Sequence, residues 1–299
     1  MRRNMLIAAG TVLALTLAAC GGDTKEADST DKAATDVLAT DISHIKEDAD
    51  IAALVPESVK KDGKLTIGDN IYYAPAEFYA ADGKTAQGYD IDMAKALAKV
   101  MGLEADIQQS EFAAIIPAIG SKYEVGIANF SITAERQKTV NMIQYFEVGS
   151  SWSVGEDNPK DFDPASPCGF TIGVQTGTVQ DEAIEAINAT CDEKIEIQRY
   201  KEQSAVTTAL AGGKLDAMYT DSSVADYAAR ITDGSTEKVG TTEDVAGVGI
   251  VVSKEDAALT EAIQKALQKL IDDGDLKKIF DTWGIAEGVA SEALLNPAK

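Results

Sequence analysis

Two charged residues at predicted strand ends could bind the opposite charges of a small molecule. Arg136 follows the apolar segment 125–128, and a guanidinium can hold a carboxylate through two parallel hydrogen bonds. Asp221 follows the segment 216–219 and could accept hydrogen bonds from an ammonium group. Taken alone, each has a plainer explanation, because Arg136 could be a surface charge and Asp221 the N-cap of the next helix.

Three further residues near strand ends could complete such a site. Thr178 follows Gly177 at the start of a predicted helix, where N–H groups and a hydroxyl suit an anion, although most such turns only cap a helix. Tyr73 and Phe112 could enclose an apolar stem, although such aromatic residues usually belong to the core. The combined set is complementary to a zwitterion, such as a free α-amino acid.

Alternating strands and helices predict how these residues are brought together. The predicted strands lie at 65–68, 105–108, 125–128, 152–154, 170–174, 195–200, 216–219 and 248–252, and most are followed by helical segments. This alternation predicts an α/β fold with mostly parallel sheets and helices on both faces. Crossovers near 150–154 and 246–250 suggest two lobes, whose strand-end loops would surround one cleft.

The composition excludes several classes of function. A length of 299 residues allows about two domains. The chain has 27 Lys and Arg against 49 Asp and Glu, a net charge of −22, which argues against nucleic acid as a partner. Its single histidine, His44, leaves little basis for histidine catalysis or a His-rich metal site. We expect no metal and no cofactor.

The N-terminus has the features of an export signal. A positive start at Arg2 and Arg3 precedes an apolar stretch that is too short to span a bilayer. The residues 17–21, Leu-Ala-Ala-Cys-Gly, resemble the lipobox of bacterial lipoproteins, which implies cleavage of residues 1–19 and lipidation of Cys20. Ordinary secretion with a free Cys20 is the alternative. We expect a flexible tether over 20–45 and a protein anchored outside the cytoplasmic membrane.

Two cysteines remain after Cys20 is assigned to the lipid. Cys168 and Cys191 form an even pair in a chain that we expect to reach an oxidising compartment. We predict a disulfide that closes a loop of about 24 residues and contributes about 3 kcal/mol. Two buried thiols are the alternative.

Several ordered blocks of the sequence resemble the family 3 extracellular solute-binding proteins, the polar amino-acid receptors of ABC transporters. The resemblance covers about residues 48–285. The blocks that carry it are Gly88–Met93 with Leu97, Ala98 and Met101 downstream, Phe112–Ile119, Ser131–Arg136, Gly173–Thr178 and Asp275–Gly284.

The resemblance implies which residues hold the main-chain groups of an amino acid. It assigns the ligand α-carboxylate to Arg136, with help from Ser131 and Thr178. It assigns the α-ammonium to Asp221, completed by a group near Asn129.

The resemblance also implies which residues contact the ligand side chain. Tyr73 and Phe112 would pack on it, Asn70 stands where many members have an acidic residue, and Gln175 stands where some glutamine receptors have lysine. The neutral amides of Asn70 and Gln175 favour an uncharged polar ligand over a basic one. An acidic Asp69 turned inward would reverse this preference.

The implied architecture is a type II periplasmic-binding-protein-like fold with a hinged cleft. Lobe 1 would comprise 46–151 and 250–287, lobe 2 would comprise 152–249, and 288–299 would form a C-terminal tail. Closure of the hinge on the ligand would precede delivery to a membrane permease, and we expect a monomer.

Two alternatives use the same cleft. One is an exported enzyme similar to the cyclohexadienyl dehydratases, in which Glu77 or Asp69 would have to act as the general acid. The other is the ligand-sensing receptor of a signalling system, which the sequence separates poorly from a transport receptor.

Overall fold

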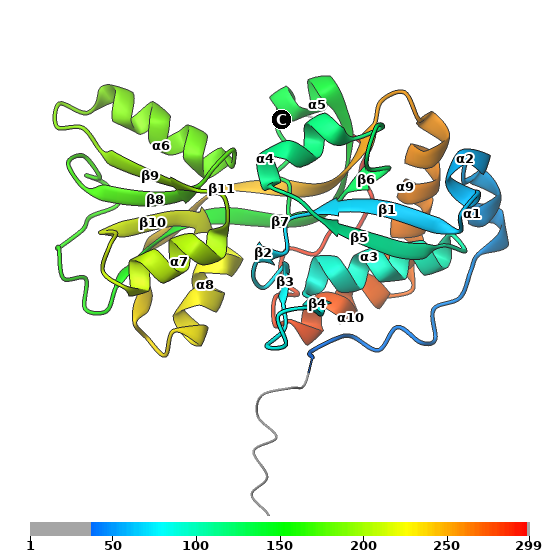
Figure 1. The fold of residues 1–299 in the computed structure, drawn as a ribbon, viewed down its shortest axis with the longest axis horizontal. Coiled ribbons are helices and arrows are strands. Elements are labelled where there is room, and N and C mark those ends of the chain that lie inside the picture. The colour runs from blue at the N-terminus through cyan, green and yellow to red at the C-terminus, as the bar shows by residue number, and fades with distance from the viewer. Residues whose placement is uncertain (1–36, 298–299) are drawn as a thin grey trace, which may run out of the picture. The chain divides into compact units, whose positions relative to one another are not determined.

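The computed structural model describes residues 37–297. These residues belong to one compact unit with a large and a small β-sheet and helices on both faces of the large sheet (Figure 1). In this part of the chain, no helix has both the length and the apolar character needed to cross a membrane. The signal peptide and Cys20 lie outside the described residues, so the lipid anchor remains a prediction.

The secondary-structure elements alternate along the chain as the sequence predicts. The main sheet consists, in spatial order, of β5 (Glu104–Gln109), β1 (Lys64–Asp69), β6 (Val125–Gly126), β11 (Thr236–Ser253), β7 (Val140–Gly155), β10 (Ala217–Asp221), β8 (Thr171–Gln175) and β9 (Glu196–Tyr200). The small sheet consists of β2 (Tyr72–Tyr73), β3 (Glu77–Tyr79) and β4 (Ala86–Gln87). The helices are α1 (Ala49–Leu54), α2 (Glu57–Lys60), α3 (Tyr89–Val100), α4 (Phe112–Ile115), the 3₁₀ turn η1 (Ile116–Ala118), α5 (Ala134–Thr139), α6 (Val179–Thr190), α7 (Gln203–Ala211), α8 (Ser222–Ile231), α9 (Ala257–Asp272) and α10 (Asp275–Thr282).

Two long strands join the two halves of the main sheet. The strands β7, with 16 residues, and β11, with 18 residues, pair antiparallel along most of their length. They connect the parallel group β5-β1-β6 with the parallel group β10-β8-β9. The α/β class and mostly parallel main sheet are confirmed, and β7 and β11 link the two expected sheets into one hydrogen-bonded sheet.

Separate hydrophobic clusters lie on the two sides of these long strands. We use lobe 1 for β1–β6 with α1–α5, α9 and α10, and lobe 2 for β8–β10 with α6–α8, while β7 and β11 belong to both. In lobe 1, Leu97 of α3 and Ile263 of α9 pack with Ile67 of β1. In lobe 2, Ile184 of α6 packs with Val174 of β8. The exact residue limits of the lobes and their movement as units remain predictions.

The sequence explains where α3 begins and ends. Gly88, which precedes the helix, has φ of 136°, and Gly102, which follows it, has φ of 72°. Both angles lie in the region that favours glycine. A β-carbon at Gly88 would lie 2.0 Å from the carbonyl oxygen of Ala76, so this turn also requires the absence of a side chain.

The predicted disulfide is present. Cys168, just before β8, is bonded to Cys191 at the end of α6, and their Cα atoms are 5.6 Å apart. The bond joins two segments that enclose the core of lobe 2, where Cys191 itself is buried.

Segments at both ends of the described chain contact lobe 1. In the region predicted as tether, the Thr40 amide donates to Asp92 at 2.8 Å, and the His44 Nε2 lies 2.7 Å from Asp275. In the predicted tail, the amide of Gln144 in β7 donates to the Leu294 carbonyl at 2.9 Å. Packing against lobe 1 therefore extends beyond the limits 46 and 287 expected from the sequence.

Substitution of Gly88 should destabilise the protein through its backbone. We expect Gly88→Ala to cost about 3 kcal/mol of unfolding free energy, because strained backbone and steric overlap act together. Gly83→Ala is the matched control, since Gly83 also has positive φ (66°) but no atom within 4 Å of its would-be β-carbon. It should cost about 1 kcal/mol. Urea unfolding followed by circular dichroism measures both, and equal losses would contradict the steric argument.

Candidate functional site

One small cavity between the lobes collects most of the predicted site. Its volume is about 10 Å³. The predicted residues that line it are Tyr73, Phe112, Asn129, Ser131, Arg136, Thr178 and Asp221. Ala128, Val179 and Gln180 also line the cavity, and the sequence did not point to them. The two other predicted residues, Asn70 and Gln175, lie outside this lining.

Arg136 reaches across the cleft from the first turn of α5. Its Nη1 donates to the Ser131 carbonyl at 2.8 Å, and its Nη2 donates to the Gly177 carbonyl of lobe 2 at 3.1 Å. The guanidinium lies over the rings of Phe112 and Phe130, at 5.5 and 5.8 Å from their centroids. Burial lowers the pKa of Arg136, although it stays charged at any physiological pH. The cavity therefore has a fixed positive charge on the lobe 1 side.

Asp221 is the negative counterpart at the end of β10. It precedes α8, but its side chain makes no capping hydrogen bond to that helix, so the plainer explanation as an N-cap does not hold. Instead, it accepts hydrogen bonds from Tyr73 at 2.8 Å, from Asn129 at 2.7 Å and from Gln180 at 2.7 Å. Burial raises the pKa of Asp221, and these three donors oppose that rise. The Asp221 carboxylate, at the end of β10 in lobe 2, is therefore hydrogen-bonded to residues of both lobes.

Thr178 and Asn129 are held by local turns. The Thr178 hydroxyl donates to the Gln175 carbonyl at 2.8 Å and accepts from the Asp181 amide at 3.2 Å, so it caps α6. The Asn129 backbone has φ of 48°, and its side-chain oxygen accepts from the Tyr89 hydroxyl at 3.0 Å. Both side chains are therefore fixed where they meet the cavity.

The aromatic pair has two different roles in the structure. Phe112 stacks on Phe130, with ring centroids 4.7 Å apart, and so forms an apolar floor under Arg136. Tyr73 uses its hydroxyl to donate to Asp221 and lies 3.3 Å from the Thr220 hydroxyl. Tyr73 is thus a polar contact between lobes as well as a wall.

Asn70 and Gln175 contact each other outside the cavity lining. The Gln175 Nε2 donates to the Asn70 Oδ1 at 2.9 Å and to the Lys201 carbonyl at 3.1 Å, while the Asn70 Nδ2 donates to the Ser110 carbonyl at 2.7 Å. Both side chains are fully buried or nearly so. This pair is therefore a second polar contact between the lobes.

Three carboxyl groups are buried in lobe 1 behind the cavity wall. Asp69, Glu77 and Asp90 are almost completely shielded from solvent, and no hydrogen-bond partner for either Asp69 oxygen is found among the described residues. Burial raises the pKa of Asp90 to about 7, and burial with mutual repulsion raises those of Asp69 and Glu77 well above their usual range. Within residues 37–297, no group of three or more His, Cys, Asp or Glu side chains has metal-binding geometry.

Comparison with known proteins identifies the family. The sequence model of the bacterial extracellular solute-binding proteins, family 3, matches residues 65–286. The chain belongs to this family.

Relatives and solved structures agree with this assignment. The family 3 protein is 35% identical to the arginine-binding protein ArgT of Corynebacterium glutamicum, over 83% of each chain. It is 30% identical to the ABC transporter arginine-binding protein 1 of Escherichia coli, over 74% of this chain and 90% of the relative. The structure of an ancestral arginine-binding protein bound to arginine matches with a TM-score of 0.69 and 32% identity, covering 74% and 98% of the two chains. The predicted family and fold are confirmed, and the protein is a substrate-binding receptor.

Of the lining residues that the sequence of this family 3 protein did not point to, Gln180 makes the polar contacts. Its Nε2 donates both to Asp221 and to the Ser150 hydroxyl of β7, at 2.7 and 2.8 Å. The only local signal is its position two residues after Thr178, in the first turn of a helix that starts at the cleft. Many helices that have no binding site begin in the same way. The role of the Gln180 side chain can therefore be recognised only from the three-dimensional structure.

The buried carboxyls predict that the stability of this family 3 protein depends on pH. A raised pKa means that the folded state keeps its proton after the unfolded state has lost it, so stability falls as pH rises. For Asp90, whose folded pKa is about 7, the loss occurs between about pH 4 and pH 7. We expect unfolding free energy to fall by about 1 kcal/mol per pH unit from this group over pH 5–7.

Urea unfolding at several pH values tests this expectation. Asp90→Asn should flatten the slope between pH 5 and pH 7. Asp82→Asn is the control, because hydrogen bonds to Thr85 lower the pKa of exposed Asp82 to about 2, so it stays ionised over this range. An unchanged slope in Asp90→Asn would contradict the assignment.

Proposed function

We propose that this receptor binds free arginine by closure of its two lobes and delivers it to the permease of an ABC importer. The observation that carries the proposal is the pair Arg136 and Asp221, which line one cavity from opposite lobes. A ligand with a carboxylate and an ammonium group on one carbon matches this pair. The names of the two relatives support arginine as the ligand.

The α-carboxylate would be bound by Arg136 together with the start of α6. Arg136 already points across the cleft to Gly177, the residue before Thr178, so its guanidinium and the helix N-terminus face the same space. Both favour negative charge. The Phe112 ring beneath the guanidinium keeps water from one side of it.

The α-ammonium would be bound by Asp221. The carboxylate already accepts three hydrogen bonds, and two oxygen atoms with about four lone-pair directions leave room for one more donor. Desolvation makes an ion pair in this position stronger than in water and makes an unpaired charge costly. Recognition of the ammonium group would thus favour the closed arrangement of the lobes.

The buried carboxyls of lobe 1 support a cationic side chain in the ligand. The sequence favoured an uncharged ligand through Asn70 and Gln175, unless Asp69 turned inward. Asp69 is fully buried, and the Asp90 Oδ2 accepts from the Asn129 amide of the cavity wall at 2.8 Å. Burial disfavours the ionised form of these carboxyls, and a guanidinium held beside them would restore that form, so the cluster favours a guanidinium over a neutral amide.

Binding requires the lobes to part. A cavity of about 10 Å³ holds roughly one water molecule, so an amino acid can enter only if the walls separate. The strands β7 and β11 are the continuous connections between the lobes, and their pairing shifts register between Val239 and Ala246. We propose that the hinge lies there.

The cellular arrangement follows from the predicted lipoprotein signal. Lipid on Cys20 would hold a monomeric receptor at the outer face of the cytoplasmic membrane, next to its permease. The dehydratase-like alternative is less well supported, because its candidate acids, Glu77 and Asp69, are buried and do not line the cavity.

Removal of either charge should abolish most of the affinity. We expect Arg136→Ala and Asp221→Ala each to weaken arginine binding at least tenfold, because an unpaired charge in a desolvated site costs about 2–5 kcal/mol. Lys265→Ala and Glu261→Ala are matched controls, since these residues form an exposed ion pair on α9. Isothermal titration calorimetry measures affinity, and circular dichroism verifies folding.

The identity of the ligand is tested by a thermal-shift screen of the twenty amino acids. A ligand present at 100 times its Kd stabilises the folded state by about 2.7 kcal/mol. We expect arginine to give the largest shift. A shift with glutamine and none with arginine would overturn the cationic preference, and no shift with any amino acid would overturn the receptor proposal.

A further inference from the structure

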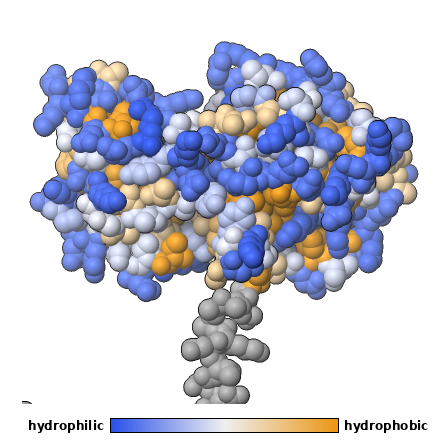
Figure 2. All heavy atoms as spheres, viewed as in Figure 1, coloured by the Kyte–Doolittle hydropathy of each residue, from blue (hydrophilic) through white to orange (hydrophobic). Residues whose placement is uncertain are grey.

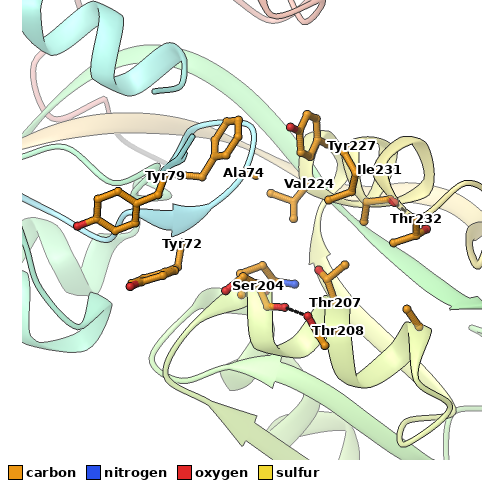
Figure 3. A pocket seen from close by; sticks show the side chains of 14 residues that line it. Tyr72, Ala74, Tyr79, Ser204, Thr207, Thr208, Val224, Tyr227, Ile231 and Thr232 are labelled. Carbon is orange, nitrogen blue, oxygen red and sulfur yellow. Dashed lines mark hydrogen bonds between the residues drawn. The ribbon is translucent and has the colours of Figure 1, made fainter. Parts of the chain in front are cut away.

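A groove outside the binding cavity has one wall on each lobe. Its volume is about 550 Å³, and it lies between the strands β2 and β3 of lobe 1 and the helices α7 and α8 of lobe 2. Figure 3 shows Tyr72 and Tyr79 on one side, Tyr227 and Ile231 on another, and Thr207 of α7 facing them. None of its lining residues belongs to the lining of the binding cavity.

The walls of this groove are mostly apolar and aromatic. The rings of Tyr72 and Tyr79 meet edge to face, with centroids 5.5 Å apart. Phe78 of lobe 1 contacts Tyr227 of lobe 2, with centroids 5.6 Å apart, so an aromatic contact bridges the two walls. Ile231 at the end of α8 is 56% exposed. On the face that Figure 2 shows, hydrophilic residues cover most of the surface and apolar residues form separate patches.

An acidic groove lies on the other side of α8. Its volume is about 510 Å³, and Glu147, Asp226, Asp281 and Glu287 line it without any Lys or Arg. Lys238 pairs with Asp226, and Lys277 pairs with Asp281, so two carboxylates remain in excess. This groove also has walls on both lobes, since Asp281 belongs to α10 of lobe 1 and Ser222 and Asp226 belong to α8 of lobe 2. The Phe78 ring also contacts Trp283, the residue before Gly284 of the acidic groove.

We propose that these two grooves form the surface that docks on the permease. An apolar side chain from an extracytoplasmic segment of the permease would enter the aromatic groove, and a neighbouring Lys or Arg would lie in the acidic groove. The chemistry of the two grooves supports this occupant, because aromatic pockets anchor protein interfaces and the excess carboxylates favour a cation. The inference rests on the proposed function.

The position of the grooves explains how a partner could recognise the loaded receptor. The ligand cavity itself is too small to admit a segment of another protein. Each groove has walls on both lobes, so parting the lobes around β7 and β11 would change the spacing between these walls and spoil the fit of a partner shaped to the closed form. A partner that fills both grooves therefore binds the closed arrangement more tightly than the open one, and this difference is the requirement for coupling.

Uptake and binding measured side by side test the proposal. Radiolabelled arginine uptake is measured in source cells that lack the native receptor and carry a variant at equal abundance. We expect Ile231→Lys and Glu287→Lys each to lower uptake at least tenfold. By calorimetry, the purified variants should bind arginine with a Kd within twofold of the original protein, because neither residue lines the ligand cavity.

A control substitution separates docking from general surface effects. Leu294 is 40% exposed and lies on the C-terminal segment, outside both grooves. Leu294→Lys should leave uptake unchanged. Normal uptake with Ile231→Lys and Glu287→Lys, despite normal arginine binding, would overturn the docking surface and leave the receptor proposal intact. If the unsubstituted protein binds no amino acid, the proposed function fails first and the docking inference fails with it.

Discussion

The hydrogen bonds of one buried carboxylate are the constraint on which the rest of the site depends. Asp221 accepts from Tyr73 and Asn129 of lobe 1 and from Gln180 of lobe 2. A charged group out of water is tolerated only when its donors are correctly placed. Three segments must therefore keep their positions relative to β10: the turn at β2, the turn at Asn129 with its positive φ, and the first turn of α6.

The parts of the site that the sequence could predict are those set by local pattern. Arg136, Thr178 and Asp221 were found because segments that follow buried parallel strands lie at the same edge of a sheet. The same reasoning gave the α/β class and the positions of the main helices. The pairing of Cys168 with Cys191 followed from the even number of remaining cysteines and from the oxidising compartment expected for an exported protein.

The parts that the sequence could not predict depend on contacts between distant segments. The strands β7 and β11 have 16 and 18 residues and pair along most of their length. The local sequence pattern predicted only short strands near Trp152 and Val248. Gln180 acquires its role only because β10 and β7 bring Asp221 and Ser150 to it. The direction of Asp69 was likewise undetermined, since consecutive strand residues point to opposite faces and a one-residue change of register reverses them.

The long strands also connect the interior of the cleft with its outer surface. Their ladder is interrupted between Val239 and Ala246, and bending there breaks fewer hydrogen bonds than bending elsewhere. A rotation at this point would open the cavity around Asp221 and, in the same movement, change the spacing between the walls of both outer grooves. Any interaction that holds Tyr73 and Asn129 against Asp221 therefore also holds Phe78 against Tyr227. By thermodynamic reciprocity, a partner that fills the outer grooves must in turn favour the closed cavity.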